Sequence, residues 1–321
     1  MEVVEPVQWY LKECSPFYIQ MIRTTPIRSI TYILLGVVLF TSACASLKNQ
    51  KMSHPETTEI TYAVNSLSMV PLRAEPNHRS EMVTQVLFGE YMIVLQNKAG
   101  WSYVQLEQDS YKGWAETIQL TPVSEADYKL FKASPKTKVA DAVFPIRINN
   151  KNTLLFKGCN LPFYSDGIFL FDNEEIPFKG AVIRGIQNST KIVNTALSYL
   201  NTPYLWGGKT PLGVDCSGFT QMVYHLNGYT IHRDASLQAK QGELVAFLQQ
   251  AQAGDLAFFD NEEENITHVG IVLDNEKIIH AAQGKVRIDR LDQEGIYNEE
   301  LKRYTHHLRL LRHYFSGQNN N

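Results

Sequence analysis

The spacing of apolar residues predicts an amphipathic helix in the C-terminal half of the chain. Within residues 217–227 the apolar positions recur every three or four residues, at Phe219, Met222, Val223 and Leu226. This spacing places them on one face of a helix. An Asn-Gly pair at 227–228 is typical of a helix end, and Asp215 is a suitable N-cap. We therefore expect a helix that begins directly after Asp215.

Short β-type runs follow this helix and are separated by turn residues. They span 256–259, 266–273, 277–282 and 285–291. Asp-Asn and Gln-Gly pairs between the last three runs are typical of tight turns. A helix packed on an antiparallel sheet predicts an α+β fold for this part of the chain.

A β-rich block occupies residues 60–121 and resembles a bacterial SH3-type barrel, including its terminal Gly-Trp pair. Its runs span 69–73, 82–83, 91–95, 101–106 and 113–115. A weaker block at about 140–185 ends in Lys-Gly-Ala-Val-Ile, where the first block has Lys-Gly-Trp-Ala. We interpret residues 122–185 as a linker followed by a divergent second SH3-type domain.

The segment before these blocks is typical of an export signal. From Met21 two arginines precede an eleven-residue apolar run at 30–40, which is too short to span a bilayer. Small residues then lead to Cys44, an arrangement that resembles a bacterial lipoprotein cleavage site. We expect residues 21–44 to be a lipoprotein signal peptide with lipidation at Cys44, and a non-lipidated signal is the alternative.

The regions on either side of this signal are polar. Residues 1–20 carry three glutamates against one lysine, whereas the start of an export signal should be positive. We interpret them as a misannotated extension before a start at Met21. Residues 45–59 lack apolar periodicity and are interpreted as a tether. The expected location is the cell envelope, facing the periplasm and anchored to the inner or outer membrane.

Composition narrows the classes of partner. The chain has 321 residues, 44% of them hydrophobic, which is typical of a globular protein with two or three domains. A net charge of −3 argues against nucleic acid as a partner. The four cysteines form no disulfide framework or metal-binding pattern, so we expect neither a metal nor another cofactor.

Cys216 at the predicted helix start is the strongest chemical signal. Unpaired amides and the helix dipole favour an anion there, so we expect the pKa of the thiol to lie below the usual value of about 8.5. His268 and His280 follow on neighbouring β-type runs. A thiol nucleophile needs a base and a group that orients the base. Each residue alone is more often structural, but the three in this order favour catalysis.

The motifs around these residues resemble the NlpC/P60 cysteine peptidases. The resemblance rests on Pro-Tyr-Leu-Trp-Gly-Gly at 203–208, Asp-Cys-Ser-Gly-Phe at 215–219, Thr-His-Val-Gly-Ile at 267–271 and Ile-His-Ala at 279–281. It implies a papain-like catalytic domain over 186–321 that cleaves peptidoglycan stem peptides. It also implies that Cys216 is the nucleophile, His268 the general base and acid, and His280 the orienting group. Tyr204 matches a tyrosine whose hydroxyl lies beside the thiol.

Two SH3-type domains before such a domain resemble the layout of the γ-D-glutamyl-L-diamino acid endopeptidases, which recycle wall fragments. The match includes an Arg-Asp-Ala segment at 233–235. It implies that Arg233 and Asp234 help to close the cleft, with Asp234 facing the free amine of an N-terminal L-Ala. The further substrate-binding candidates that it implies are Glu81, Tyr111, Asp215 and Ser217.

The expected function is therefore hydrolysis of the bond between γ-D-Glu and the diamino acid in free stem peptides, with peptidoglycan-derived peptides as partners. A broader murein hydrolase is the alternative, and a non-catalytic wall-binding lipoprotein is a third. The sequence leaves open whether L-Lys or meso-diaminopimelate is preferred.

Overall fold

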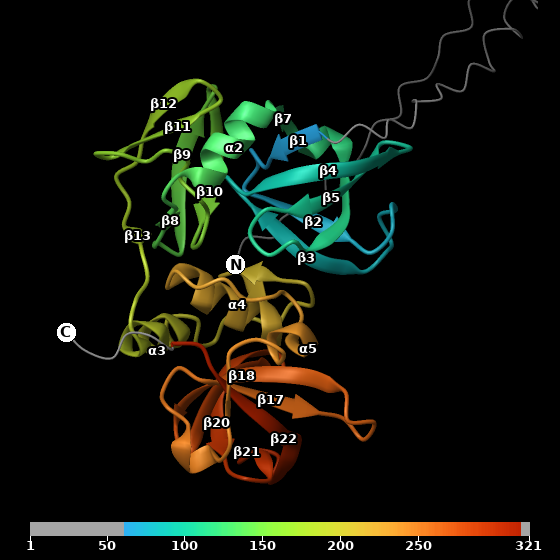
Figure 1. Ribbon diagram of the computed structural model, residues 1–321, viewed down its shortest axis with the longest axis vertical. Coiled ribbons are helices and arrows are strands. Elements are labelled where there is room, and N and C mark those ends of the chain that lie inside the picture. Colours follow the sequence, from blue (N-terminus) through green and yellow to red (C-terminus); the bar gives the residue numbers. More distant parts are fainter. Residues whose placement is uncertain (1–60, 316–321) are drawn as a thin grey trace, which may run out of the picture. The chain divides into compact units, whose positions relative to one another are not determined.

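The first strands of the chain pair into one antiparallel sheet. The computed structural model describes residues 61–315, and its first seven strands are ordered β3-β2-β6-β5-β4-β1-β7 (Figure 1). Their bounds are β1 (Thr61–Val64), β2 (Met69–Arg73), β3 (Met82–Leu87), β4 (Tyr91–Lys98), β5 (Trp101–Leu106), β6 (Lys112–Glu116) and β7 (Thr121–Val123), with the 3-10 helix η3 (Thr117–Gln119) before β7. All five β-type runs predicted here lie within β2 to β6. We call residues 61–123 the first β domain.

Alternation of side chains explains why these residues form a sheet with one packed face. In β2 and β5 every second side chain is buried, as expected for strands with one face on a core. The buried side chains form a cluster that includes Val70, Leu72, Met92 and Val104. This core fixes the positions of the loops at the edge of the domain.

The next segment is built from a helix, two short hairpins and a pair of strands that are distant in the sequence. Helix α2 (Glu125–Ala133) begins at Ser124, whose hydroxyl accepts the Asp127 N–H at 3.0 Å. Six strands then form three two-stranded ladders, β8 with β13, β9 with β10 and β11 with β12. Their bounds are β8 (Thr137–Val139), β9 (Val143–Ile148), β10 (Lys151–Phe156), β11 (Ile168–Phe171), β12 (Glu174–Pro177) and β13 (Val182–Arg184). The assignment of 122–185 to a linker and a second SH3-type domain stays a prediction.

A second large sheet forms the C-terminal part, ordered β16-β22-β17-β18-β19-β20-β21. Because β21 also pairs with β22, six of its strands close into a barrel. The bounds are β16 (Glu243–Val245), β17 (Leu256–Asp260), β18 (Ile266–Asp274), β19 (Lys277–Ala282), β20 (Lys285–Leu291), β21 (Gly295–Asn298) and β22 (Arg303–His313). All four predicted β-type runs are confirmed as β17 to β20, whereas β16, β21 and β22 were not predicted.

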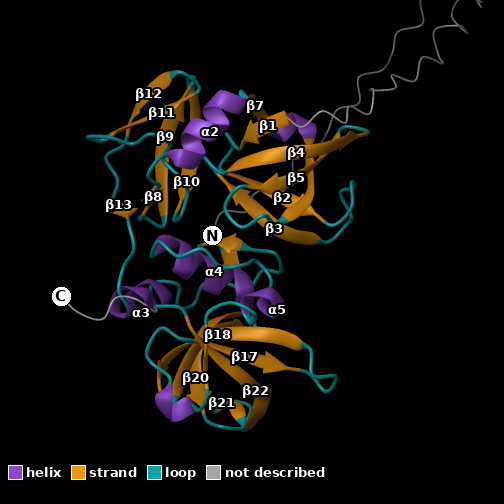
Figure 2. Cartoon of the chain, in the orientation of Figure 1, coloured by secondary structure: helices purple, strands orange, loops and turns teal. Residues whose placement is uncertain are grey.

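Helices α3, α4 and α5 gather on one side of this sheet (Figure 2). They span α3 (Ser189–Leu197), α4 (Cys216–Leu226) and α5 (Ala235–Gln238), with a short hairpin of β14 (Lys209–Thr210) and β15 (Gly213–Val214) before α4 and the 3-10 helix η4 (Leu248–Gln250) after α5. Helix α4 is the predicted helix, and every one of its residues is buried. Its packing on β18 and β19 gives the α+β arrangement expected from the sequence.

Buried polar contacts join the first β domain to the C-terminal part. Lys209 and Glu90 form an ion pair of 3.2 Å with both side chains almost fully buried. The Lys209 N–H also donates to Gln85 Oε1 at 2.8 Å. Gly207 has a φ of +75°, and a Cβ there would lie 2.3 Å from the Met82 carbonyl oxygen. The backbones therefore meet at a point that only glycine permits.

The predictions for residues 1–59 concern a segment outside the described residues. These are the extension, the signal peptide, the lipidation of Cys44 and the tether. Between residues 61 and 315, no helix has the length and apolar character needed to cross a membrane.

Candidate active site

Helix α4 places Cys216 at its first position, as the sequence predicts. Asp215 is the N-cap, and its Oδ1 accepts the Gly218 N–H at 2.6 Å. Cys216 is 8% exposed and lines two cavities, whose linings share Cys216 and Thr267. A thiol at this place can therefore meet a ligand in either cavity although it is largely enclosed.

The expected lowering of the thiol pKa was wrong. Burial raises the pKa of Cys216 to about 11, and the nearby Asp215 carboxylate adds to the rise. Arg233 and backbone N–H groups act in the opposite direction but do not overcome these two effects. The pKa of His268 is held well below 6.5 by burial and by the neighbouring histidines. Both groups are therefore neutral at rest, so a base must remove the thiol proton during reaction.

A chain of hydrogen bonds connects the two predicted histidines to an aspartate. His268 Nε2 lies 2.8 Å from His280 Nδ1, and His280 Nε2 lies 2.9 Å from Asp289 Oδ2. An ionised carboxylate only accepts, so it requires a proton on His280 Nε2. His280 Nδ1 then accepts from His268 Nε2, which leaves His268 Nδ1 as the basic nitrogen. The arrangement fixes the tautomer that a general base needs.

Asp289 was missed by the sequence analysis. It lies in β20, where Arg287 pairs with His280 in register and donates to both Asp289 oxygens at 2.7 and 2.9 Å. These bonds and those of His280 lower the pKa of Asp289 although burial opposes them. The signal was present, because the alternation of the 285–291 run places Asp289 and Arg287 on the same side of the hairpin as His280.

His306 is a second residue that the sequence analysis missed. Its ring stacks on that of His268, with centroids 4.0 Å apart and planes at 23°. Burial lowers the pKa of His306 to about 4, and the proximity of His280 adds to this effect. No local signal marked His306, since β22 itself was not predicted. It provides a neutral surface that holds one face of His268.

The three imidazoles also have the spacing of a metal site. Within residues 61–315, nitrogen atoms of His268, His280 and His306 all lie within 4.8 Å of one another. However, His268 and His280 share a hydrogen bond, and the nearly parallel His268 and His306 rings cannot direct both lone pairs to one point. Coordination by all three would require the rings to rotate. The arrangement therefore suits proton transfer better than metal binding.

Tyr204 lies on the histidine side of Cys216. Both residues line a cavity of about 530 Å³, together with His268 and His306. Burial raises the pKa of Tyr204 to about 12, and the proximity of Cys216 contributes to the rise. The hydroxyl therefore remains protonated and can donate a hydrogen bond inside this cavity.

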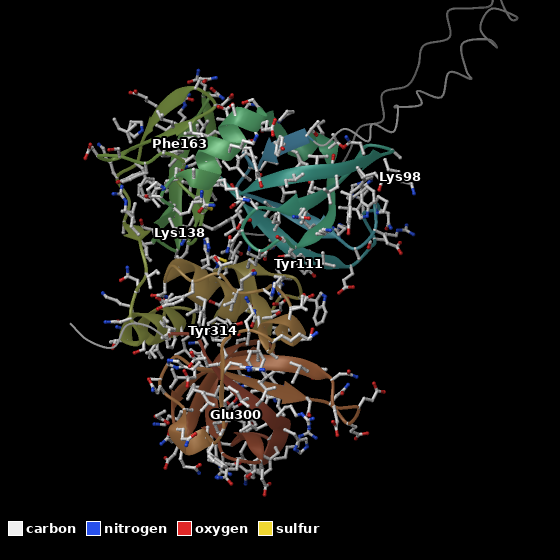
Figure 3. The ribbon with its side chains drawn as sticks, viewed as in Figure 1. Lys98, Tyr111, Lys138, Phe163, Glu300 and Tyr314 are labelled. Carbon is white, nitrogen blue, oxygen red and sulfur yellow. The ribbon has the colours of Figure 1, made fainter. Side chains whose placement is uncertain are left out.

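The other predicted site residues line a smaller cavity of about 330 Å³, which also reaches Cys216. Its walls include Glu81 and Tyr111 from the first β domain and Asp234 from the N-terminus of α5. The Tyr111 hydroxyl donates to Asp234 Oδ1 at 3.1 Å, and Figure 3 shows Tyr111 on the side of its domain that faces the C-terminal part. Burial and Asp234 raise the pKa of Tyr111, so this hydroxyl stays protonated.

Glu81 lies at the rim of this cavity. Its side chain is exposed, and Oε1 accepts the Trp206 indole N–H at 2.6 Å. Trp206 is itself 60% exposed. The first β domain and the loop before Cys216 therefore meet at this hydrogen bond, which leaves the second carboxylate oxygen of Glu81 available.

Arg233, Asp215 and Ser217 form one buried polar group. The Arg233 side chain is 2% exposed, and its Nη2 pairs with Asp215 Oδ2 at 2.5 Å. Its Nη1 donates to Ser217 Oγ at 2.8 Å, and its Nε donates to Thr84 Oγ1 in β3 at 2.9 Å. These side chains already satisfy one another, so their contribution to the site includes holding the first β domain against the start of α4.

Comparisons with known proteins agree with this arrangement. The sequence pattern of the NlpC/P60 family matches residues 201–306, and that of the bacterial dipeptidyl-peptidase SH3 domain matches residues 72–120. The gamma-D-glutamyl-L-lysine dipeptidyl-peptidase of Bacillus subtilis is 34% identical over 239 residues, which cover 68% of this chain and 78% of the relative. The protein of that name from Bacillus cereus is 28% identical over 254 residues, which cover 68% of this chain and 74% of the relative.

A solved structure has the same fold. The crystal structure of an NlpC/P60 family protein from Bacillus cereus aligns with a TM-score of 0.67 at 22% identity, and the alignment covers 79% of this chain and 99% of that one. With the family match around Cys216 and a relative above 30% identity of which this chain covers more than two thirds, the chain belongs to the NlpC/P60 family of cysteine peptidases.

Proposed function

We propose that this protein is a peptidoglycan hydrolase that cleaves between γ-D-glutamate and the L-diamino acid of free stem peptides with an N-terminal L-Ala. The observation that carries this proposal is the Asp234 carboxylate, which Tyr111 holds at 3.1 Å in the 330 Å³ cavity next to Cys216. The names of the two Bacillus relatives specify a bond of the same kind.

The position of Asp234 explains why a free amine would be selected. A half-buried carboxylate that faces a ligand is stabilised by a positive charge, and a ligand without one leaves it unpaired at a cost of several kcal/mol. A free L-Ala amine supplies that charge. A stem peptide still linked to muramic acid carries an amide at this position and needs more space. Intact wall should therefore be a poor substrate.

The hydrogen-bond chain leaves His268 Nδ1 as the base for Cys216. His268 Nδ1 takes the proton of the neutral Cys216 thiol as the sulfur attacks the γ-carbonyl carbon. N–H groups at the start of α4 stabilise the negative oxygen. The C–N bond then breaks, and His268 gives its proton to the amine of the leaving diamino acid. Water, deprotonated by His268, releases the dipeptide from Cys216.

In this scheme His280 and Asp289 act through His268. Replacing Asp289 by asparagine allows an amide N–H to donate to His280 Nε2, which reverses the hydrogen bonds and moves the His268 proton onto Nδ1. We expect kcat to fall by about 10²-fold or more with KM nearly unchanged, because the general base and not substrate binding is affected. Steady-state kinetics on the free tripeptide L-Ala-γ-D-Glu-L-Lys measures both constants. A rise in KM at constant kcat would contradict the assigned role.

The proposed function is tested by giving the protein a free peptide and intact wall. Mass spectrometry of reactions with L-Ala-γ-D-Glu-L-Lys should show the L-Ala-γ-D-Glu dipeptide and free lysine. Purified sacculi incubated in parallel should release little. Release from sacculi at a comparable rate would favour the broader murein hydrolase, and no product from either would favour a wall-binding protein.

An anchor at Cys44 would hold this activity in the cell envelope, facing the periplasm. It would place the enzyme where peptides released from the wall are found. This location stays a prediction from residues 21–44.

A further inference from the structure

The charged side chains that line the 530 Å³ cavity, which contains His268 and Cys216, make it positive. In the proposed function it receives the diamino acid, because Asp234 holds the other end of the substrate in the 330 Å³ cavity. No aspartate or glutamate of residues 61–315 lines it. Burial keeps the pKa of both His268 and His306 below the usual histidine range, so these two rings are neutral. Arg303 is the remaining basic residue of its lining and makes the cavity positive.

Among the described residues, Arg303 has no carboxylate partner and no hydrogen bond from its guanidinium, whereas Arg312 of the same strand donates to the Ala239 carbonyl oxygen at 2.8 Å. Arg287, Arg290 and Arg309 each form ion pairs with aspartate or glutamate. Arg303 forms none within residues 61–315, and its side chain is exposed at the start of β22. Its guanidinium is therefore free to bind a carboxylate of a ligand.

A second donor lies in the lining of the same cavity. Gln283 is in the turn between β19 and β20, and its Oε1 accepts the Asn298 side-chain N–H at 2.7 Å. This bond uses the amide oxygen and leaves the Nε2 donors without a partner among the described residues. Besides the Tyr204 hydroxyl near Cys216, the cavity thus offers Arg303 and Gln283 as donors that suit a carboxylate, and its lining in residues 61–315 has no acidic group that suits an ammonium.

The distance of Arg303 from the reacting atoms indicates which of the two carboxylates of diaminopimelate it can bind. His306 stacks on His268, and Arg303 precedes it by three residues in β22. At about 3.3 Å per residue, their Cα atoms are roughly 10 Å apart. The α-carboxylate of the diamino acid lies next to the scissile bond. A carboxylate at the end of its side chain lies several ångströms farther out, nearer to Arg303.

We infer that Arg303 and Gln283 form a binding site for the distal carboxylate of the diamino acid side chain. The site selects stem peptides with meso-diaminopimelate at the third position over those with L-lysine. The lysine side chain ends in an ammonium alone. Arg303 repels this ammonium, and among the described residues the cavity lining has no acidic residue that would pair with it. This inference rests on the proposed function, because it requires the diamino acid to occupy this cavity.

Kinetics on two peptides that differ only in this carboxylate test the inference. For the wild-type protein we expect kcat/KM for L-Ala-γ-D-Glu-meso-diaminopimelate to exceed that for the L-Lys peptide by about tenfold, since an exposed charge pair is partly screened by water. Arg303→Gln should remove most of this difference by lowering the rate on the diaminopimelate peptide alone. Arg303→Glu should reverse the order. The matched control is Lys302→Gln, which removes a neighbouring charge that does not line the cavity.

Each other outcome has a definite meaning. Equal wild-type rates on the two peptides would overturn the inference and leave the proposed function intact. An equal loss on both peptides in Arg303→Gln would mean that Arg303 binds the shared α-carboxylate, which also overturns it. A loss in Lys302→Gln as large as that in Arg303→Gln would mean that the overall positive charge of this surface, and not a contact with Arg303, causes the preference, which would likewise overturn the inference. If the wild-type protein cleaves neither peptide, the proposed function itself fails.

Discussion

Replacing Cys216 by alanine should abolish turnover of the free tripeptide, with kcat/KM reduced by at least about 10⁴-fold. The sulfur forms the covalent bond of the proposed mechanism, and no second cysteine of residues 61–315 lines either cavity. The methyl group of alanine fits the space of the thiol, so the fold should persist. The loss should be measured on protein whose thermal unfolding matches that of the wild type.

Cys159 provides the matched control. It is fully buried, its Sγ accepts the Phe156 N–H at 3.2 Å, and burial raises the pKa of its thiol to about 12. It lines neither cavity at Cys216. Cys159→Ala should therefore change stability more than kcat. Comparable losses of activity in the two variants would mean that Cys216 is not the only reactive thiol.

Local sequence signals were sufficient to predict the main elements of the site. The apolar spacing and the Asp215 cap predicted helix α4, and alternation with turn residues predicted β17 to β20. The contact between His268 and His280 follows from placing them on neighbouring strands of a hairpin. All of these features depend on residues that lie close together in the chain, which is why pattern and spacing can reveal them.

The pKa of Cys216 could not be predicted in this way. The helix start was recognised, and it favours the thiolate. Enclosure of the sulfur between α4 and the sheet, and the charge of Asp215, favour the thiol more strongly and raise its pKa to about 11. Enclosure depends on residues that are distant in sequence. Predicting where a helix begins therefore does not predict the pKa of the residue at that position.

Contacts between the first β domain and the C-terminal part also could not be predicted from local sequence patterns. Resemblance named Glu81 and Tyr111, and the structure places both in the wall of the same cavity as Asp234. Nothing in the sequence indicated the buried pair of Glu90 with Lys209. An ion pair so enclosed is costly to break, because removing one partner leaves a buried charge. It holds in place the domain that supplies Tyr111.

Acetylation of the substrate's N-terminal amine should reduce kcat/KM by about 10²-fold or more. The acetyl group removes the positive charge that Asp234 would pair with and adds bulk to the 330 Å³ cavity. Leaving the Asp234 carboxylate unpaired costs several kcal/mol, and together with steric conflict this gives a loss of this size. The measurement compares L-Ala-γ-D-Glu-L-Lys with its N-acetyl form under identical conditions.

The variant Asp234→Asn separates recognition of the amine from a structural role. The amide can still accept the Tyr111 hydrogen bond that Asp234 accepts at 3.1 Å, so the local structure should be kept. Cleavage of the free peptide should fall because the charge pair is lost, whereas the acetylated peptide should lose little more. The ratio of kcat/KM for the free peptide to kcat/KM for the acetylated peptide therefore decreases. If Asp234 only capped the short helix α5, both rates would fall together and the ratio would stay constant. Equal cleavage of the two peptides by the wild-type protein would exclude selection for a free amine and favour an enzyme that acts on polymeric wall.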